Sequence, residues 1–152
     1  MIKAKDIMTT EVVSVRPETD IMSAARLLLS KHFNGVPVVD DSDRILGIIC
    51  QSDLIVQQEK IPIPSFFSLL GGVIPLKSPS EIDAEMKKIA ALTVQDAMTP
   101  DPVTVSPDTG IDEIATLMVK KNIHTLPVQE NGILVGIIGK EDILRTYLPA
   151  NA

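Results

Sequence analysis

The chain has 152 residues and a formal net charge of −6 at pH 7, and 45% of its residues are hydrophobic while only 3% are aromatic. This composition is typical of a globular protein, and the acidic balance argues against a basic face that binds nucleic acid or an anionic membrane. A single cysteine, Cys50, excludes an internal disulfide, and no apolar stretch follows the charged start of the chain. We therefore expect a cytoplasmic protein that contacts neither nucleic acid nor a membrane.

In the first half, we expect a strand over Glu11–Val15, a helix over Ile21–Lys31 capped by Thr19, strands over Gly35–Val39 and Arg44–Cys50, and a final helix from Gln51. The helix follows from apolar residues at 3.6-residue spacing, and the strands follow from short apolar or alternating runs between turn residues. In the second half, we expect a strand over Pro102–Val105, a helix over Ile111–Lys121, strands over Thr125–Gln129 and Ile133–Gly139, and a helix over Lys140–Tyr147. Each half reads as β-α-β-β-α, and Asn131-Gly132 is the stronger hairpin signal.

The two halves also repeat the same residues. Four segments recur in the same order: Asp6-Ile7-Met8-Thr9 as Asp96-Ala97-Met98-Thr99, Val13–Pro17 as Val103–Pro107, Val36-Pro37-Val38 as Leu126-Pro127-Val128, and Gly47-Ile48-Ile49 as Gly136-Ile137-Ile138. The copies are 90 residues apart before the second turn and 89 after it. Such self-similarity indicates two copies of one supersecondary unit, with a site between them.

The segment between the copies matches neither of them. Ile61–Leu76 is apolar, but prolines interrupt it and it is too short to span a bilayer. We interpret it as a linker packed on the module or as a dimer surface, with a membrane contact as the alternative. A capping pattern at Ser80 predicts an amphipathic helix to about Ala91, and Thr93 with Asp96 repeats this pattern before the second copy.

These motifs resemble a tandem pair of CBS domains, the family named after cystathionine β-synthase. The resemblance rests on the D-x-M-T opening, the apolar-Pro-Val strand and the terminal G-h-h-x-x-x-D, each present twice. It covers 1–58 and 92–148, and leaves 59–91 as a linker and 149–152 as a tail. It implies an α/β (α+β) fold in which two pseudo-symmetric β-α-β-β-α CBS units pack sheet to sheet and form two clefts.

The resemblance also implies a function. Many CBS pairs are regulatory modules that bind an adenosine-containing ligand such as AMP, ADP, ATP or S-adenosylmethionine, and that pair into homodimers. We therefore expect a stand-alone regulatory module that needs no cofactor, forms a homodimer and acts on an unknown regulated protein. The alternative is a dimerisation or docking module that binds no nucleotide.

In the family, the aspartate of the terminal motif accepts hydrogen bonds from the ribose hydroxyls, a charge-assisted contact. Here this position is Asp53 in one copy and Asp142 in the other. Both also lie in the first turn of an expected helix, where a carboxylate stabilises the exposed N–H groups without any ligand. Ligand contact and helix stabilisation therefore both stay open for these two aspartates.

Two features of the terminal motif depart from the family. Cys50 and Gly139 replace the usual Thr or Ser, so the hydroxyl that caps the helix and contacts the ligand is lost. Ser52 and Glu141 stand where a basic residue often meets phosphate, although Lys140 is adjacent to Glu141. We interpret Cys50 as a small buried group rather than a redox thiol, and we expect weaker polyphosphate binding in both clefts.

The remaining candidate residues follow from position in the motif. Adenine is expected at the start of the second strand of each copy, the cleft walls at the start of each copy, and phosphate near the end of the second copy's first helix: Gly35, Val36, Pro37, Thr125, Leu126, Pro127; Thr10, Val12, Val13, Pro100, Val103; Lys121, His124. For the first two groups, ordinary strand core is the alternative. For Lys121 and His124, the alternative is that they stabilise the helix C-terminus.

Catalytic and metal motifs are missing from the sequence. The chain has no glycine-rich phosphate loop, no G-x-S-x-G and no pairing of a nucleophile with His32 or His124. Two histidines and one cysteine without ligand spacing do not predict a metal site. We therefore expect no enzymatic activity, with a small metal- or redox-sensing protein as a third class of function.

Overall fold

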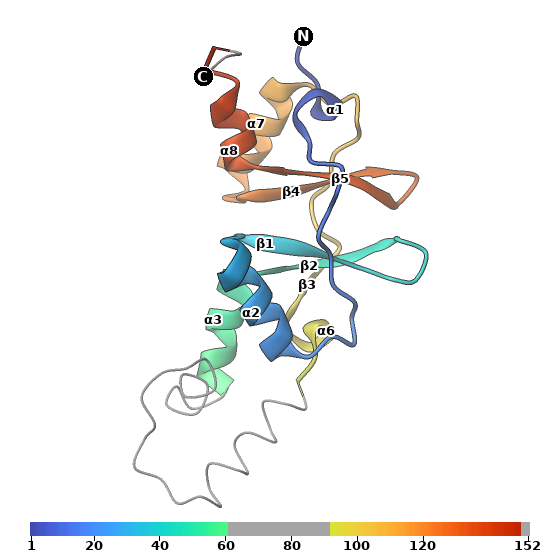
Figure 1. Ribbon diagram of the computed structural model, residues 1–152, viewed down its shortest axis with the longest axis vertical. Coiled ribbons are helices and arrows are strands. Elements are labelled where there is room, and N and C mark those ends of the chain that lie inside the picture. Colours follow the sequence, from blue (N-terminus) through green and yellow to red (C-terminus); the bar gives the residue numbers. More distant parts are fainter. Residues whose placement is uncertain (61–91, 150–152) are drawn as a thin grey trace, which may run out of the picture.

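The computed structural model describes residues 1–60 and 92–149, which form two similar halves stacked on one another (Figure 1). The first half contains α2 (Ile21–Lys31), β1 (Gly35–Val39), β2 (Ile45–Cys50) and α3 (Gln51–Lys60). The second contains α7 (Ile111–Lys120), β4 (Thr125–Glu130), β5 (Ile133–Gly139) and α8 (Lys140–Arg145). In each half the helices cover the outer face of an antiparallel sheet, and the two sheets face each other. The expected α+β fold with sheet-to-sheet packing is confirmed.

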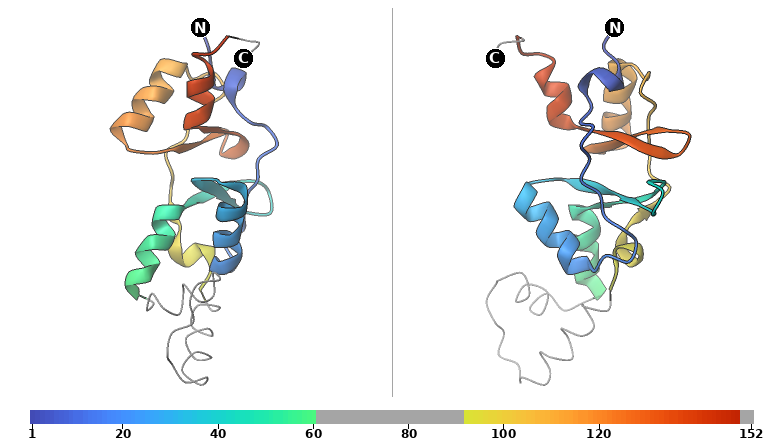
Figure 2. Two further views of the ribbon diagram at one scale, coloured as in Figure 1. Left: turned by 60° about the vertical axis from the view of Figure 1, so that its left-hand side comes forward. Right: turned by 45° about the vertical axis from the view of Figure 1, so that its right-hand side comes forward.

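The leading segment of each copy packs on the opposite half. The short helix α1 (Ala4–Ile7) lies beside the second half, whereas α6 (Val94–Ala97) lies beside the first (Figures 1 and 2). Ala4 is fully buried among the apolar residues of the second half, and Val94 is fully buried in those of the first. The strand β3 (Thr99–Pro100) then pairs with β2. The halves are therefore interlocked, and each core is completed by the other copy's leading segment.

The prediction of strands over Glu11–Val15 and Pro102–Val105 is wrong. Each segment forms only one parallel bridge, between Val15 and Val38 and between Val105 and Val128. The Val15 N–H donates to the Pro37 carbonyl at 3.0 Å, and the Val39 N–H donates to the Val15 carbonyl at 2.9 Å. Extending this ladder in either direction would need an N–H from Pro37 or from Pro17, and proline has none.

The second bridge ends for the same reason, because Pro107 and Pro127 stand at the equivalent positions. Sequence reasoning recognised the apolar alternation of these segments but not the missing donors.

Local capping differs from the prediction at one helix. The Asp20 side chain, rather than Thr19, caps α2 by accepting from the Ser23 N–H at 3.1 Å. Thr19 instead accepts from the Arg16 N–H at 3.1 Å and closes the preceding turn. The capping pair of Thr93 and Asp96 is confirmed, with the Thr93 N–H donating to Asp96 at 2.8 Å. The helix expected from Ser80 and the apolar stretch Ile61–Leu76 lie outside the described residues.

The hairpin turns fasten the two sheets together at one end. The Ile45 N–H donates to the Gly132 carbonyl at 3.1 Å, and the Leu134 N–H donates to the Asp43 carbonyl at 2.9 Å. Asn131 and Gly132 both adopt positive φ, at 55° and 83°, as the hairpin signal predicts. The opposite ends of the sheets, where β1 and β4 begin, are left to border the two cavities described next.

Two candidate ligand-binding cavities

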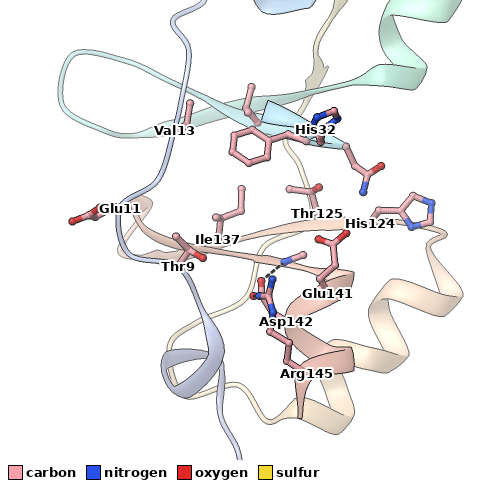
Figure 3. Close-up of a pocket in the computed structure, with 15 residues that line it drawn as sticks. Thr9, Glu11, Val13, His32, His124, Thr125, Ile137, Glu141, Asp142 and Arg145 are labelled. Carbon is pink, nitrogen blue, oxygen red and sulfur yellow. Dashed lines mark hydrogen bonds and ion pairs between the residues drawn. The ribbon is translucent and has the colours of Figure 1, made fainter. Parts of the chain in front are cut away.

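A cavity of about 220 Å³ lies between the halves at Asp142, and we call it the Asp142 cavity (Figure 3). It combines the leading segment of the first copy, the end of α2 with the start of β1, and the junction of β5 and α8. Its lining residues are Thr9, Glu11, Val13, His32, Phe33, Asn34, Gly35, Val36, His124, Thr125, Ile137, Gly139, Glu141, Asp142 and Arg145. Figure 3 shows Asp142, Glu141 and Arg145 together on α8, with His32 across the space between the halves.

A second cavity of about 460 Å³ lies at Asp53, and we call it the Asp53 cavity. Its lining residues are Asn34, Ile48, Cys50, Gln51, Ser52, Asp53, Ile55, Thr99, Asp101, Pro102, Val103, Asn122, Ile123, His124 and Thr125. These positions repeat the Asp142 cavity: Thr99, Asp101 and Val103 correspond to Thr9, Glu11 and Val13 in the sequence repeat. The pseudo-twofold of the chain therefore yields two related cavities, each built from both copies.

In both aspartates, one carboxylate oxygen accepts a hydrogen bond from a backbone N–H and the other accepts one from a side chain. Asp53 accepts from the Cys50 N–H at 2.8 Å and from the Thr99 hydroxyl at 3.1 Å. Asp142 accepts from the Gly139 N–H at 2.7 Å and from the Arg145 guanidinium at 2.9 Å (Figure 3). The backbone bonds fix each carboxylate at the start of its helix. The second oxygen of each carboxylate is bound by a side chain, from Thr99 at Asp53 and from Arg145 at Asp142.

Cys50 and Gly139 are complementary to the residues opposite them. Cys50 pairs with Gly35 across β1 and β2, and Gly139 pairs with Thr125 across β4 and β5. A Cβ on Gly35 would stand 2.7 Å from the Cys50 sulfur. The cysteine side chain at position 50 therefore requires a glycine at position 35. Burial, with a smaller contribution from the Asp53 charge, raises the pKa of Cys50 to about 11. Its thiol is therefore protonated at neutral pH, which does not suit a redox-reactive cysteine.

The structure brings half of the sequence-predicted site residues into the two cavities. Those that line a cavity are Asp53, Asp142, Gly35, Val36, Val13, Val103, Thr125 and His124. Those that line neither cavity are Pro37, Leu126, Pro127, Thr10, Val12, Pro100, Lys121 and Lys140. Pro37, Leu126 and Pro127 are buried in the sheets, and Pro100 is paired with Gly47. Whether any of these residues contacts a ligand stays a prediction.

Sequence reasoning missed several lining residues in the leading segments, above all Glu11 and Asp101 and the threonines Thr9 and Thr99. The signal was available, because successive side chains of an extended chain alternate between two sides. Val13 was a candidate, so Glu11 and Thr9 share its side, whereas Val12 and Thr10 do not. Asn34, which lines both cavities, carried no motif that could have identified it.

Other site types are not found in the described part of the chain. Across residues 1–60 and 92–149, three or more His, Cys, Asp or Glu side chains nowhere gather in a way that could hold a metal ion. Within the same ranges, each helix is too short or too polar to cross a membrane.

Comparison with known proteins gives the family. The CBS domain family model matches residues 4–59 and 94–149. An uncharacterized protein of Methanocaldococcus jannaschii, MJ1426, is 30% identical over 95% of this chain and 90% of its own length. The crystal structure of CBSX2 in complex with AMP is 25% identical, covers all of both chains and superposes with a TM-score of 0.75. The CBS domain pair of protein MJ0100, in complex with 5′-methylthioadenosine and S-adenosyl-L-methionine, is 25% identical over 97% of this chain and all of its own, with a TM-score of 0.71. The chain belongs to the CBS domain family and carries two CBS domains in tandem.

Proposed function

We propose that this protein is a regulatory module that binds an adenosine-containing ligand in the cavities between its two CBS domains. The observation that carries the proposal is the arrangement of Asp53 and Asp142. Each aspartate faces a cavity, is held by a backbone N–H, and has a second oxygen bound by a side chain. A ribose diol offers two hydroxyl donors to such a carboxylate, a contact stronger than one between neutral groups. The AMP bound to CBSX2 and the nucleosides bound to MJ0100 support an adenosine compound as the ligand class.

The regulatory part of the proposal follows from where the halves are joined. Two backbone hydrogen bonds fasten the hairpin turns at Asp43–Ile45 and Gly132–Leu134, while both cavities lie at the other end of the sheets. A ligand wedged between the starts of β1 and β4 acts on the spacing of the halves at that end. It shifts the protein between arrangements to the extent that it binds one of them better. The arrangement would then be read by a regulated protein or by the second protomer of a homodimer.

A thermal-shift series tests the binding step. The full-length protein, freed of co-purified ligand, is heated with AMP, ADP, ATP or S-adenosylmethionine. A ligand at 100 times its Kd adds about 2.7 kcal/mol to the free energy of unfolding, which gives a shift of several degrees. The shift should fall when Asp53→Ala and Asp142→Ala are combined, while Asp108→Ala, an exposed aspartate outside both cavities, should leave it unchanged. A lack of shift with all four compounds would refute the proposal.

A second candidate function is a dimerisation or docking module that binds no ligand. It is favoured by apolar side chains exposed on α3 and just after α8: Ile55 is 68% exposed, Val56 51%, Tyr147 81% and Leu148 59%. Exposed apolar side chains favour contact with another protein where they form one continuous patch. Under this function, light scattering shows a stable dimer, and neither aspartate substitution changes anything except local stability.

A further inference from the structure

Two methionines occupy equivalent places in the leading segments, Met8 directly after α1 and Met98 directly after α6. Each packs on the opposite half, because Met8 lies against the apolar cluster of the second half and Met98 against that of the first. Both side chains are half-buried, whereas Met1 at the start of the chain is 88% exposed. The two thioethers therefore help to hold each leading segment on the other copy's core while staying within reach of small solutes.

Each of these sulfur atoms lies directly over a glycine of the opposite sheet. A Cβ added to Gly47 would stand 2.7 Å from the Met98 sulfur, and a Cβ added to Gly136 would collide with the Met8 sulfur. Gly47 in β2 and Gly136 in β5 are equivalent positions of the repeat, so the same close approach occurs twice. Because non-bonded carbon contacts are favourable only at about 3.5–4.0 Å, no further atom fits between either sulfur and the strand beneath it.

The residue after each methionine connects this packing to a cavity. Thr9 lines the Asp142 cavity and exchanges two backbone hydrogen bonds with Ile137 of β5, at 2.9 and 3.0 Å. Thr99 lines the Asp53 cavity, and its hydroxyl donates to the Asp53 carboxylate at 3.1 Å. A displacement of either methionine therefore moves a residue in the wall of a cavity.

We propose that Met8 and Met98 are paired oxidation sites, at which a peroxide releases the leading segments from the opposite halves. The peroxide transfers one oxygen atom to the thioether sulfur, so the sulfur loses two electrons, the O–O bond breaks, and the peroxide leaves as water or an alcohol. The sulfoxide is polar, and burying its oxygen among apolar side chains without a hydrogen-bond donor costs free energy. The step is reversible, because methionine sulfoxide reductases restore the thioether. Release of the segments does not require a bound ligand, so this inference is independent of the proposed function.

Thermal unfolding of the full-length protein before and after treatment with hydrogen peroxide tests the proposal, with peptide mass spectrometry to locate each added oxygen. We expect oxygen at Met8 and Met98 in the folded protein and an unfolding midpoint lowered by about 4 °C or more. Met8→Leu combined with Met98→Leu keeps apolar side chains of similar volume, so peroxide should leave the midpoint of this variant unchanged. The matched control combines Met22→Leu with Met118→Leu, two half-buried positions on α2 and α7, and should lose nearly as much as the wild type. An equal loss in both variants would overturn the inference, as would a folded protein in which Met8 and Met98 resist oxidation or are oxidised without a change in midpoint.

Amide hydrogen exchange separates a local release from a general loss of stability. In the oxidised protein, we expect the peptides that cover 4–9 and 94–99 to exchange about tenfold faster or more, because their protection depends on packing against the opposite half. The amides of Ile45 and Leu134, which join the halves at the hairpin turns, should keep their original exchange rates. A uniform increase across both halves, or unchanged exchange in the two leading segments, would overturn the inference.

Discussion

The close approach of Gly35 to Cys50 predicts that a larger residue at position 35 destabilises the protein. A Cβ at residue 35 would stand 2.7 Å from the Cys50 sulfur and 3.1 Å from the Ile49 carbonyl oxygen. Carbon contacts are favourable at about 3.5–4.0 Å, so the sulfur must move by about 1 Å within the packed strand pair. Overpacking of this kind costs about 1–3 kcal/mol, and we expect Gly35→Ala to lower the free energy of unfolding by that amount.

Urea denaturation at 25 °C measures this cost, and two further variants test its cause. Gly139→Ala is the matched control, because the nearest atom to a Cβ there is 3.8 Å away. We expect it to change the free energy of unfolding by less than about 0.5 kcal/mol. Cys50→Ala removes the sulfur, so the double variant should be about 1–2 kcal/mol more stable than the sum of the two single effects predicts. Equal costs at residues 35 and 139, or strictly additive effects, would refute the proposed contact.

Three further predictions concern the helix cap, the core and the cysteine. The hydrogen bond from Ser23 holds the pKa of Asp20 below its usual value. Asp20→Ala should therefore cost about 1 kcal/mol at pH 7, and the cost should vanish as the pH falls from about 4 through the lowered pKa; a cost that does not change with pH would contradict this. Leu126→Ala, at a fully buried position, should cost about 2–5 kcal/mol by urea denaturation, whereas Val119→Ala at the surface should cost less than about 0.5 kcal/mol. With its pKa raised to about 11, Cys50 should react with iodoacetamide at pH 7.5 about 100-fold more slowly in the folded protein than in urea; similar rates would show an ionised thiol.

Much of the fold could be predicted because the same pattern of motifs occurs twice in the sequence. The bounds of Gly35–Val39, Ile133–Gly139 and Ile21–Lys31 match the structure, since each is a clear apolar run or helical stripe between turn residues. The exchange of leading segments was not predictable in the same way. Ala4 and Val94 are small apolar residues whose burial depends on the core of the opposite half, far away in the sequence. Local patterns do not say which of two similar halves such a residue joins.

The site was predicted less completely than the fold. Motif position identified Asp53 and Asp142, and the structure places both at cavities. It did not identify Asp101 or Arg145, because their importance arises from which side chains face the same space across two copies. It also selected Leu126 and Pro127, whose side chains are used in the core. A strand can pass a cavity while directing alternate side chains elsewhere, so proximity in the motif is a weaker guide than the direction of each side chain.

The central claim is that an adenosine compound binds at the two aspartates, and calorimetric titration of the ligand-free protein with AMP, ATP and S-adenosylmethionine tests it most directly. The account predicts saturable binding of at least one compound, weakened by Asp53→Ala or by Asp142→Ala and abolished when the two are combined. Asp108→Ala should bind as the wild type does. No detectable binding of any of the three compounds, or binding that persists when both aspartates are replaced, would contradict the account and favour the docking module.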